Sequence, residues 1–331
     1  MRPDARLQDL TPATVRGTSA ALAALFGVGS SLALLETIDD YPAAGGQAVR
    51  YGLAAVLLAL VLRGRRVPRP TGRQLGRLAL LAASGLAGFN LLVIAAERSM
   101  DPASVGVVVA TVPIVLVIAA PLQERRRVRP RVLLAAAVVA LGAAAVQGVG
   151  GDVTAAGLAA ALGALLGEAA FSLVAAPLLP LLGALGVSAW CTALAVPQLL
   201  LYGIVADGAG GVLRAPALDE ALVLVYLGAV VTAGCFVLWY TGVRLLGVER
   251  AGLLTGAMPA GALLTGAVLG SSALSPGRLA GVLAVAGGIA VGMRAARVGA
   301  PAGPRSVAPR TAALRAAGPS AAPGAVNCGS E

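Results

Sequence analysis

The sequence predicts an all-α membrane protein with about ten transmembrane helices, arranged as two five-helix repeats inserted in opposite orientations. Three observations support this fold class. Hydrophobic residues make up 58% of the 331 residues and charged residues only 12%, whereas a soluble domain carries roughly 25% charged residues. The apolar residues form ten long runs, and two stretches of the chain resemble each other at a constant spacing. Too little polar surface remains to cover a water-soluble globule, so lipid must be part of the solvent.

Ten apolar runs are long enough to cross a bilayer, which takes about 20 residues of helix. The spans are predicted at 17–38, 43–62, 75–96, 103–122, 131–149, 153–174, 185–205, 220–242, 250–270 and 276–294. Five spans fall in the first repeat, 17–149, and five in the second, 153–294. Residues 1–16 are expected to be a cytoplasmic segment. Residues 295–331 are rich in Ala, Pro, Gly and Arg and are predicted to be a disordered cytoplasmic tail.

The arginines predict the orientation of these spans. All 25 basic residues are Arg, and 21 of them lie in the N-terminal segment, the tail, or the connections on that same side. The opposite connections carry acidic residues such as Glu36, Asp40 and Asp101. Basic residues concentrate on the cytoplasmic side, so both termini are predicted to be cytoplasmic in an inner (plasma) membrane protein. The same pattern accounts for the net charge of +10, so the expected partner is membrane lipid and not nucleic acid.

Several kinds of chemistry are excluded by what the sequence lacks. The chain contains no His, which removes imidazole catalysis and most zinc sites. Its three cysteines, Cys191, Cys235 and Cys328, have no metal-binding spacing. Without a Walker motif, ATP-driven transport by this chain alone is excluded. We therefore expect no metal, no cofactor and no enzyme activity.

The internal repeat is strongest between the third and fourth spans and the eighth and ninth. The two stretches align at an offset of 146 residues, and the pairs in register are Gly88 and Gly234, Arg98 and Arg244, Gly106 and Gly252, and Pro113 and Pro259. Because five is an odd number of spans, the second copy must insert upside down. Inverted repeats are a transporter architecture with a substrate site near the middle of the membrane.

The run from Ala95 to Gln147 resembles the EamA domain of the drug/metabolite transporter superfamily. That domain has a fourth helix with a mid-span Pro, then a Glu, a basic loop and a Gly-containing fifth helix, and these places are taken by Pro113, Glu124 and Gly142. Arg50 matches an Arg often seen early in the second helix of the family. The second repeat diverges, because the Glu is replaced near Ser271 or Ser272. The resemblance spans about 17–294 and implies secondary transport of small metabolites, often export.

Two ionisable residues within the spans are the main site candidates. A charge inside the membrane costs roughly 2.5–3.5 kcal/mol, so such residues usually have a function. Arg50 would bind a substrate carboxylate with its forked guanidinium. Glu168 would carry a coupling proton or oppose an amine. Alternatively, the two only neutralise each other or backbone groups and hold helices together, although their depths differ by roughly 10 Å.

Other residues are candidates for lining a cavity or for gating. Asn90 is a polar group within a span, although hydrogen bonding between helices would also explain it. Pro113 and Pro259 each free a backbone carbonyl and could bend a gate. Trp190 could cage a cation, whereas Trp239 and the adjacent Tyr240 are expected to be anchors at the membrane interface.

The predicted function is secondary transport of a small metabolite by alternating access. We expect export of an amino acid or related compound, coupled to protons or another gradient. One alternative is a cation exporter of the small-multidrug type that uses Glu168, although the aromatic content of 3% disfavours it. Another is a non-transporting membrane enzyme or scaffold. Faces of small residues could pack within one chain or between two chains. The sequence is therefore compatible with a monomer and with a homodimer.

Overall fold

The computed structural model describes residues 12–35, 38, 40–65, 67–148, 151–208, 210–268, 270 and 274–298. Every regular element in these residues is helical. The elements are α1 (Pro12–Leu35), α2 (Ala43–Arg63), α3 (Gly72–Leu81), η3 (Ala82–Gly88), α4 (Phe89–Glu97), α5 (Pro102–Val109), α6 (Val112–Gln123), α7 (Pro130–Gln147), α8 (Ala155–Leu173), α9 (Leu179–Asp207), α10 (Leu218–Tyr226), η4 (Leu227–Gly234), α11 (Cys235–Leu246), α12 (Val248–Leu254), α13 (Ala257–Val268) and α14 (Pro276–Val298).

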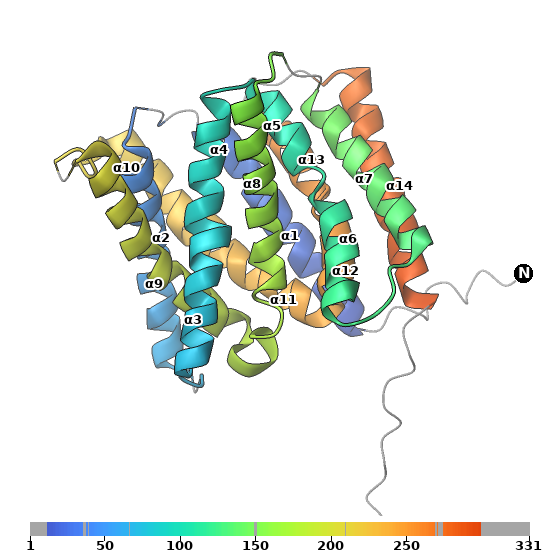
Figure 1. Ribbon diagram of the computed structural model, residues 1–331, viewed down its shortest axis with the longest axis horizontal. Coiled ribbons are helices and arrows are strands. Elements are labelled where there is room, and N and C mark those ends of the chain that lie inside the picture. Colours follow the sequence, from blue (N-terminus) through green and yellow to red (C-terminus); the bar gives the residue numbers. More distant parts are fainter. Residues whose placement is uncertain are drawn as a thin grey trace, which may run out of the picture.

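Within the described part of the chain, nine helices are long and apolar enough to cross a membrane. They are 43–63, 72–97, 102–123, 130–147, 155–173, 179–207, 218–246, 248–268 and 276–296. They correspond to nine of the ten predicted spans, and the first predicted span falls on α1, a 24-residue helix that is not among the nine. The bundle is drawn in Figure 1, where the helices lie roughly side by side.

The ends of the helices differ from the prediction in a few places. α1 begins at Pro12, inside the segment predicted as 1–16, and α14 continues to Val298, past the predicted boundary. α9 begins earlier than its predicted span, but a kink at Gly183, with φ +69°, separates its first turn from the rest. Residues 1–11 and 299–331 lie outside the described residues, so the disorder of the tail stays a prediction.

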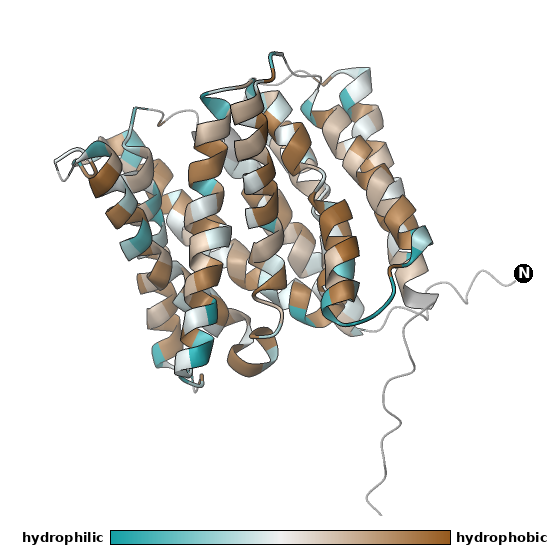
Figure 2. Ribbon diagram, in the orientation of Figure 1, coloured by the Kyte–Doolittle hydropathy of each residue, from teal (hydrophilic) through white to brown (hydrophobic). Residues whose placement is uncertain are grey.

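Large apolar side chains on the outside of the bundle form the surface that lipid would cover. On α7, Leu134 and Leu141 are 69% and 72% exposed, while Ala136 and Ala143 on the opposite face are fully buried. Figure 2 shows that hydrophobic residues run along most of the helices and that many of the hydrophilic ones lie near helix ends and in connections. A water-soluble monomer rarely exposes so much apolar surface, so this is a multi-pass membrane protein.

Small residues bring α7 and α14 together. A Cβ atom on Gly142 would lie 2.8 Å from the carbonyl oxygen of Gly281, which is closer than real Cβ contacts. Glycine at such positions allows helix backbones to approach and pack by close van der Waals contact. Figure 1 shows the two helices side by side at one edge of the bundle.

Contacts made in the first half of the chain recur in the second half with the partners exchanged. α1 packs against α11 and α13, and α8 packs against α4 and α6. α2 contacts η4, and α9 contacts η3. The central pairs, α2 with α9, α6 with α12, and α7 with α14, each join one helix from either half.

Each half of the chain also contains one π-helical segment. The π-helical segments η3 and η4 interrupt the third and eighth spans and end at Gly88 and Gly234, which are 146 residues apart. A Cβ atom on Gly88 would lie 2.5 Å from the carbonyl oxygen of Ala83, so the wide turn requires glycine there. The fourth and ninth spans break as well, between α5 and α6 and between α12 and α13.

We name the two ends of the bundle by the predicted orientation. The outer end carries the start of α2, the end of α4 and the starts of α5 and α14. The inner end carries the start of α1, the arginine-rich connection between α6 and α7, and the end of α14 (Figure 1). Asp101 begins α5 at the outer end, where its carboxylate accepts hydrogen bonds from the N–H groups of Ala103 and Ser104 at 3.0 and 3.3 Å.

Candidate functional site

A cavity of about 850 Å³ enters the bundle from the outer end. At its mouth lie helix ends, among them Tyr41, Glu97 and Arg278. At its bottom lie the two helix breaks, where Ala110 and Gly256 line it. The volume falls within the roughly 300–1,000 Å³ of sites that enclose small molecules.

The charged lining of this cavity is mainly basic. Among the residues that the structure describes, it contains three arginines, Arg50, Arg98 and Arg278, and one carboxylate, Glu97. Most of the remaining wall is apolar, for example Val93, Val109 and Leu227. The cavity is therefore suited to a molecule with an anionic group and an apolar body.

Arg50 is the most deeply buried of these charges, with 7% of its surface exposed. It lies on α2, and its Nε donates a 2.7 Å hydrogen bond to the Thr232 hydroxyl in η4. One terminal nitrogen lies 3.4 Å from the Gln47 side-chain oxygen, and the guanidinium carbon lies 5.5 Å from the centre of the Tyr51 ring. No carboxylate pairs with Arg50 among the described residues. A buried cation that lacks a counter-charge is a strong point of attraction for an anion.

Glu168 lies deeper, in the inner half of α8. It is partly buried, does not line the cavity, and makes no hydrogen bond or ion pair within the part of the chain described. It interacts electrostatically with Tyr51 and Tyr240. Arg50 and Glu168 therefore do not neutralise each other as a direct ion pair, which was the alternative to a functional role for them.

The other predicted candidates divide between the cavity and its surroundings. Asn90 lines the cavity and donates hydrogen bonds to the Tyr51 hydroxyl at 2.9 Å and to a carbonyl of its own helix. Pro259 also lines it. Pro113 is buried next to the lining residue Val112, in the first turn of α6. Trp190 packs against the main apolar core rather than the cavity.

Trp239 and Tyr240 are not interfacial anchors, contrary to the expectation from the sequence. They are 5% and 0% exposed. The Trp239 indole donates to the Ser172 hydroxyl at 3.3 Å, and the Tyr240 hydroxyl donates to the Phe171 carbonyl at 3.3 Å. They pack with Phe171 into an aromatic core in the inner half of the bundle, because their polar atoms find partners on α8.

Two residues that position Arg50 were not found from the sequence. Gln47 could have been, because it precedes Arg50 by three residues and so shares its helix face. Thr232 could not, because it is 182 residues away and only the fold brings η4 beside α2. No group of three or more metal-ligating side chains occurs among the described residues.

The fold and the cavity define a multi-pass membrane protein with a solute-sized chamber that is open at one end. Comparison with known proteins gives the family. Residues 16–147, which span α1 to α7, match the family model of the "EamA-like transporter family". A curated relative from Streptantibioticus cattleyicolor, named "Probable terminal-alkyne amino-acid exporter", is 27% identical over 212 residues, covering 64% of this chain and 70% of the relative. The first half of the chain is therefore similar to the EamA-like transporter family of the drug/metabolite transporter superfamily, and the relative named above agrees with that match.

A solved structure has the same fold. It is described only as "Crystal structure of protein" and superposes with a TM-score of 0.71 at 23% identity, covering 87% of this chain and 99% of that one. At this identity the likeness concerns the fold alone. The expectation of a membrane transporter of the EamA family is confirmed, while the substrate, direction and coupling need separate arguments.

Proposed function

We propose that this protein is a secondary exporter of an amino acid or a closely related compound that carries a free carboxylate and an apolar side chain. Arg50 binds the carboxylate, and Glu168 carries the coupling proton. The observation that carries the proposal is the guanidinium of Arg50, buried at a solute-sized cavity without a carboxylate partner in the described residues. The name of the curated relative supports the same substrate class.

The geometry around Arg50 supports recognition of a planar anion. Thr232 holds the Nε atom and Gln47 approaches one terminal nitrogen, so the guanidinium is oriented before a ligand arrives. A preoriented guanidinium can donate two parallel hydrogen bonds to a carboxylate, which a lysine ammonium cannot. A cation as substrate would be repelled here, so the small-multidrug alternative is disfavoured.

Alternating access in this proposal relies on an inverted repeat. Its support is the recurrence of contacts between the two halves, and the offset of 146 that relates Gly88 to Gly234 at the ends of η3 and η4. Two similar halves can exchange conformations, which would close the outer end and open the inner end. Both termini would then lie in the cytoplasm.

Vesicle transport with paired arginine variants tests this proposal. Purified protein is reconstituted, a proton gradient is imposed, and flux of labelled apolar amino acids is compared with flux of their amides. Arg50→Gln should lower the affinity for the acids at least about tenfold, or ~1.4 kcal/mol, and leave the amides unchanged. Arg98→Gln is the matched control, because it removes the same charge from an exposed residue at the cavity mouth. The proposal fails if neither acids nor amides move, or if both variants behave alike.

Glu168→Gln tests the coupling role separately. The variant should still bind the substrate but should no longer accumulate it against a concentration gradient when a proton gradient is imposed. Exchange of labelled for unlabelled substrate at equal pH should continue, because no net proton movement is required. Gradient-driven accumulation by the variant at the wild-type rate would exclude Glu168 as the proton carrier.

A further inference from the structure

The inner end of the bundle is closed by a contact between the two halves of the chain. Below the helix breaks, α6 packs against α12. Leu116 of α6 is 1% exposed, and a Cβ atom on Gly252 of α12 would lie only 2.7 Å from the Leu116 Cβ. Above the breaks, residues of α5 and α13 line the cavity instead. The same two spans are therefore open to the cavity at one end and packed together at the other.

An ion pair joins the two halves at the inner edge of this contact. Both terminal nitrogens of Arg126 lie 3.3 Å from Oε2 of Glu249, and the Arg126 Nε donates to Glu124 at 2.7 Å. Glu249 lies in the first turn of α12, where the helix dipole also favours a carboxylate. It is only 7% exposed, and its second oxygen, Oε1, is buried without a hydrogen-bond partner in the described residues.

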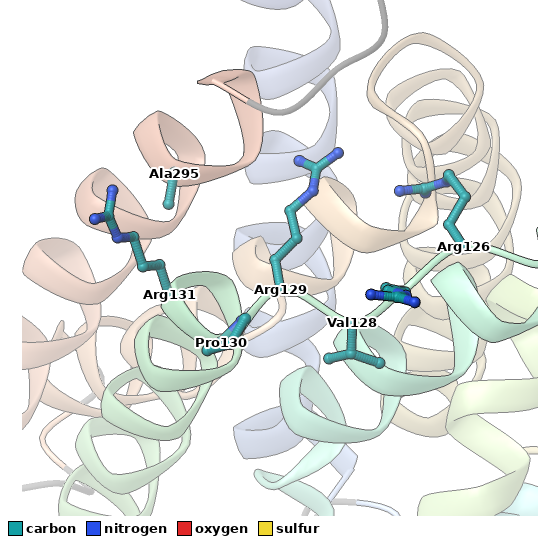
Figure 3. A pocket seen from close by; sticks show the side chains of 7 residues that line it. Arg126, Val128, Arg129, Pro130, Arg131 and Ala295 are labelled. Carbon is teal, nitrogen blue, oxygen red and sulfur yellow. The ribbon is translucent and has the colours of Figure 1, made fainter.

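Arg126 differs from its arginine neighbours in its partners. Burial lowers the pKa of the Arg126 guanidinium, but the hydrogen bonds and charges of Glu124 and Glu249 outweigh burial and raise the pKa overall. Arg129 instead donates to the Ala296 carbonyl at the end of α14. Arg127 is exposed and forms no ion pair with a carboxylate among the described residues. Figure 3 shows Arg126 at one side of the hollow formed by this connection, apart from Arg129 and Arg131.

We infer that the contact between α6 and α12 is the inner gate of the transporter and that the ion pair of Arg126 with Glu249 latches it while the cavity is open outside. This inference rests on the proposed function, since only an alternating-access carrier needs the inner end to open. When the gate opens, water would hydrate both charges, and this hydration would compensate for the loss of the ion pair. The breaks at 110–111 and 255–256 are the hinges, each followed by a proline that lacks an N–H donor.

Cysteine accessibility measures this gate without any substrate. Cys191 and Cys235 are replaced by Ala and Cys328 by Ser, and Ala120, a 1% exposed residue of α6, is changed to Cys as the probe. Sealed vesicles of known orientation are treated with a membrane-impermeant maleimide from either side. Arg126→Gln and Glu249→Gln should each raise inner-side labelling of the probe roughly tenfold, corresponding to ~1.4 kcal/mol in the gate equilibrium.

Three further variants separate the latch from other effects. Arg127→Gln removes the same charge next to the latch and should leave labelling at the wild-type rate. Arg126→Lys keeps a cation opposite Glu249 and should stay close to wild type. The exchange Arg126→Glu with Glu249→Arg should restore low labelling. Thermal unfolding in detergent should show that all variants remain folded, and labelling is compared only among those with wild-type midpoints.

The outcomes distinguish the gate from the proposed substrate. If the wild type moves no amino acid but the two latch variants open the inner end, the substrate proposal is wrong and the gate stands. If amino acids are transported while Arg126→Gln and Glu249→Gln leave labelling unchanged, the latch is refuted. Equal labelling in Arg127→Gln and Arg126→Gln also refutes it, since net charge would then explain the result.

Discussion

The outer and inner ends of this bundle use the same helices in opposite ways. At the outer end, α5 and α13 border a cavity with arginines and amides in its wall. At the inner end, α6 and α12 are in close contact, and an aromatic core that includes Phe171 and Tyr240 fills the space between α8 and α11. A carrier needs this difference to be reversible, so the inner packing must be strong enough to exclude water and weak enough to open.

Two glycines that the predicted repeat pairs with each other illustrate how the two ends differ. Gly106 in α5 and Gly252 in α12 are 146 residues apart in sequence. A Cβ atom on Gly106 would meet the side-chain amide of Gln147, a flexible group that lines the cavity. A Cβ atom on Gly252 would meet the packed stem of Leu116. One of these glycines thus faces a movable side chain at the outer end, and the other faces a closed contact at the inner end.

The largest expected effect comes from breaking the aromatic core of the inner end. Tyr240→Ala should lower the free energy of unfolding by about 3–5 kcal/mol, because it leaves a cavity beside Phe171 in the buried core. Thermal and denaturant unfolding in detergent measure the change. Tyr202→Ala is the control, since Tyr202 is 48% exposed on α9. Similar losses in both variants would show that burial in the inner core does not determine stability.

The next effect concerns the bottom of the outer cavity, where Thr232 accepts a hydrogen bond from Arg50. Thr232→Val keeps the shape of the side chain but leaves the Arg50 Nε without its 2.7 Å acceptor, which should cost about 1.5–3 kcal/mol of stability. Thr241→Val serves as the control, because the Thr241 hydroxyl donates to the Val237 carbonyl of its own helix. An equally stable Thr232→Val protein would mean that water replaces the hydroxyl and that Thr232 does not orient Arg50.

A smaller effect should separate the two glycines described above. Gly252→Ala should destabilise the protein by ~1–3 kcal/mol, because Leu116 must move within a packed contact. Gly106→Ala should cost less, since the amide of Gln147 can turn into the cavity. Unfolding midpoints of the two variants measured side by side give the difference. The reverse order would contradict the contrast between a closed inner end and an open outer end.

The smallest effect is expected at the outer surface. Arg214 and Glu220 form an ion pair in which Nη1 donates at 2.7 Å, and hydrogen bonding to Glu220 raises the pKa of Arg214. Arg214 also stacks over Tyr41 at the cavity mouth, 4.7 Å from the ring centre. The Arg214 side chain is 42% exposed, so water weakens the pair, although the Glu220 side chain is only 10% exposed. Glu220→Gln can keep the hydrogen bond that the carboxylate accepts from the Ala217 N–H, so the unfolding midpoint should fall less than in the variants above. A large drop would show that this connection closes over the cavity and belongs to the transport mechanism.

Much of the fold could be predicted because local properties of the chain determine it. Each predicted span corresponds to a helix or a continuous pair of helices in the structure. The π-helical segments and the breaks at 110–111 and 255–256 were not predicted, since apolar composition is continuous through them. The kink at Gly183 was also missed, because glycine is common in these spans and only one backbone angle reveals it.

The candidate site was predictable in part. Arg50 could be found because a charge within an apolar run is rare and costly. Glu168 was found in the same way, but its position below the cavity depends on how α8 packs against α4 and η3. Trp239 and Tyr240 were placed at the membrane interface because aromatic residues near a span end usually lie there. Their actual burial depends on Ser172 and Phe171, which come from another helix.

Helical spans, the lipid-exposed surface and the predicted orientation all come from the order of residues along the chain. A bilayer requires a minimum length of apolar helix and favours arginine on one side, and both requirements are local. The neighbours of each functional residue come from packing instead. Thr232 lies 182 residues from Arg50 and Glu249 lies 123 residues from Arg126, so these contacts form only when the two halves of the chain meet. Hydropathy predicts whether a single helix is stable in lipid. A cavity and a gate depend instead on the surfaces at which helices contact one another.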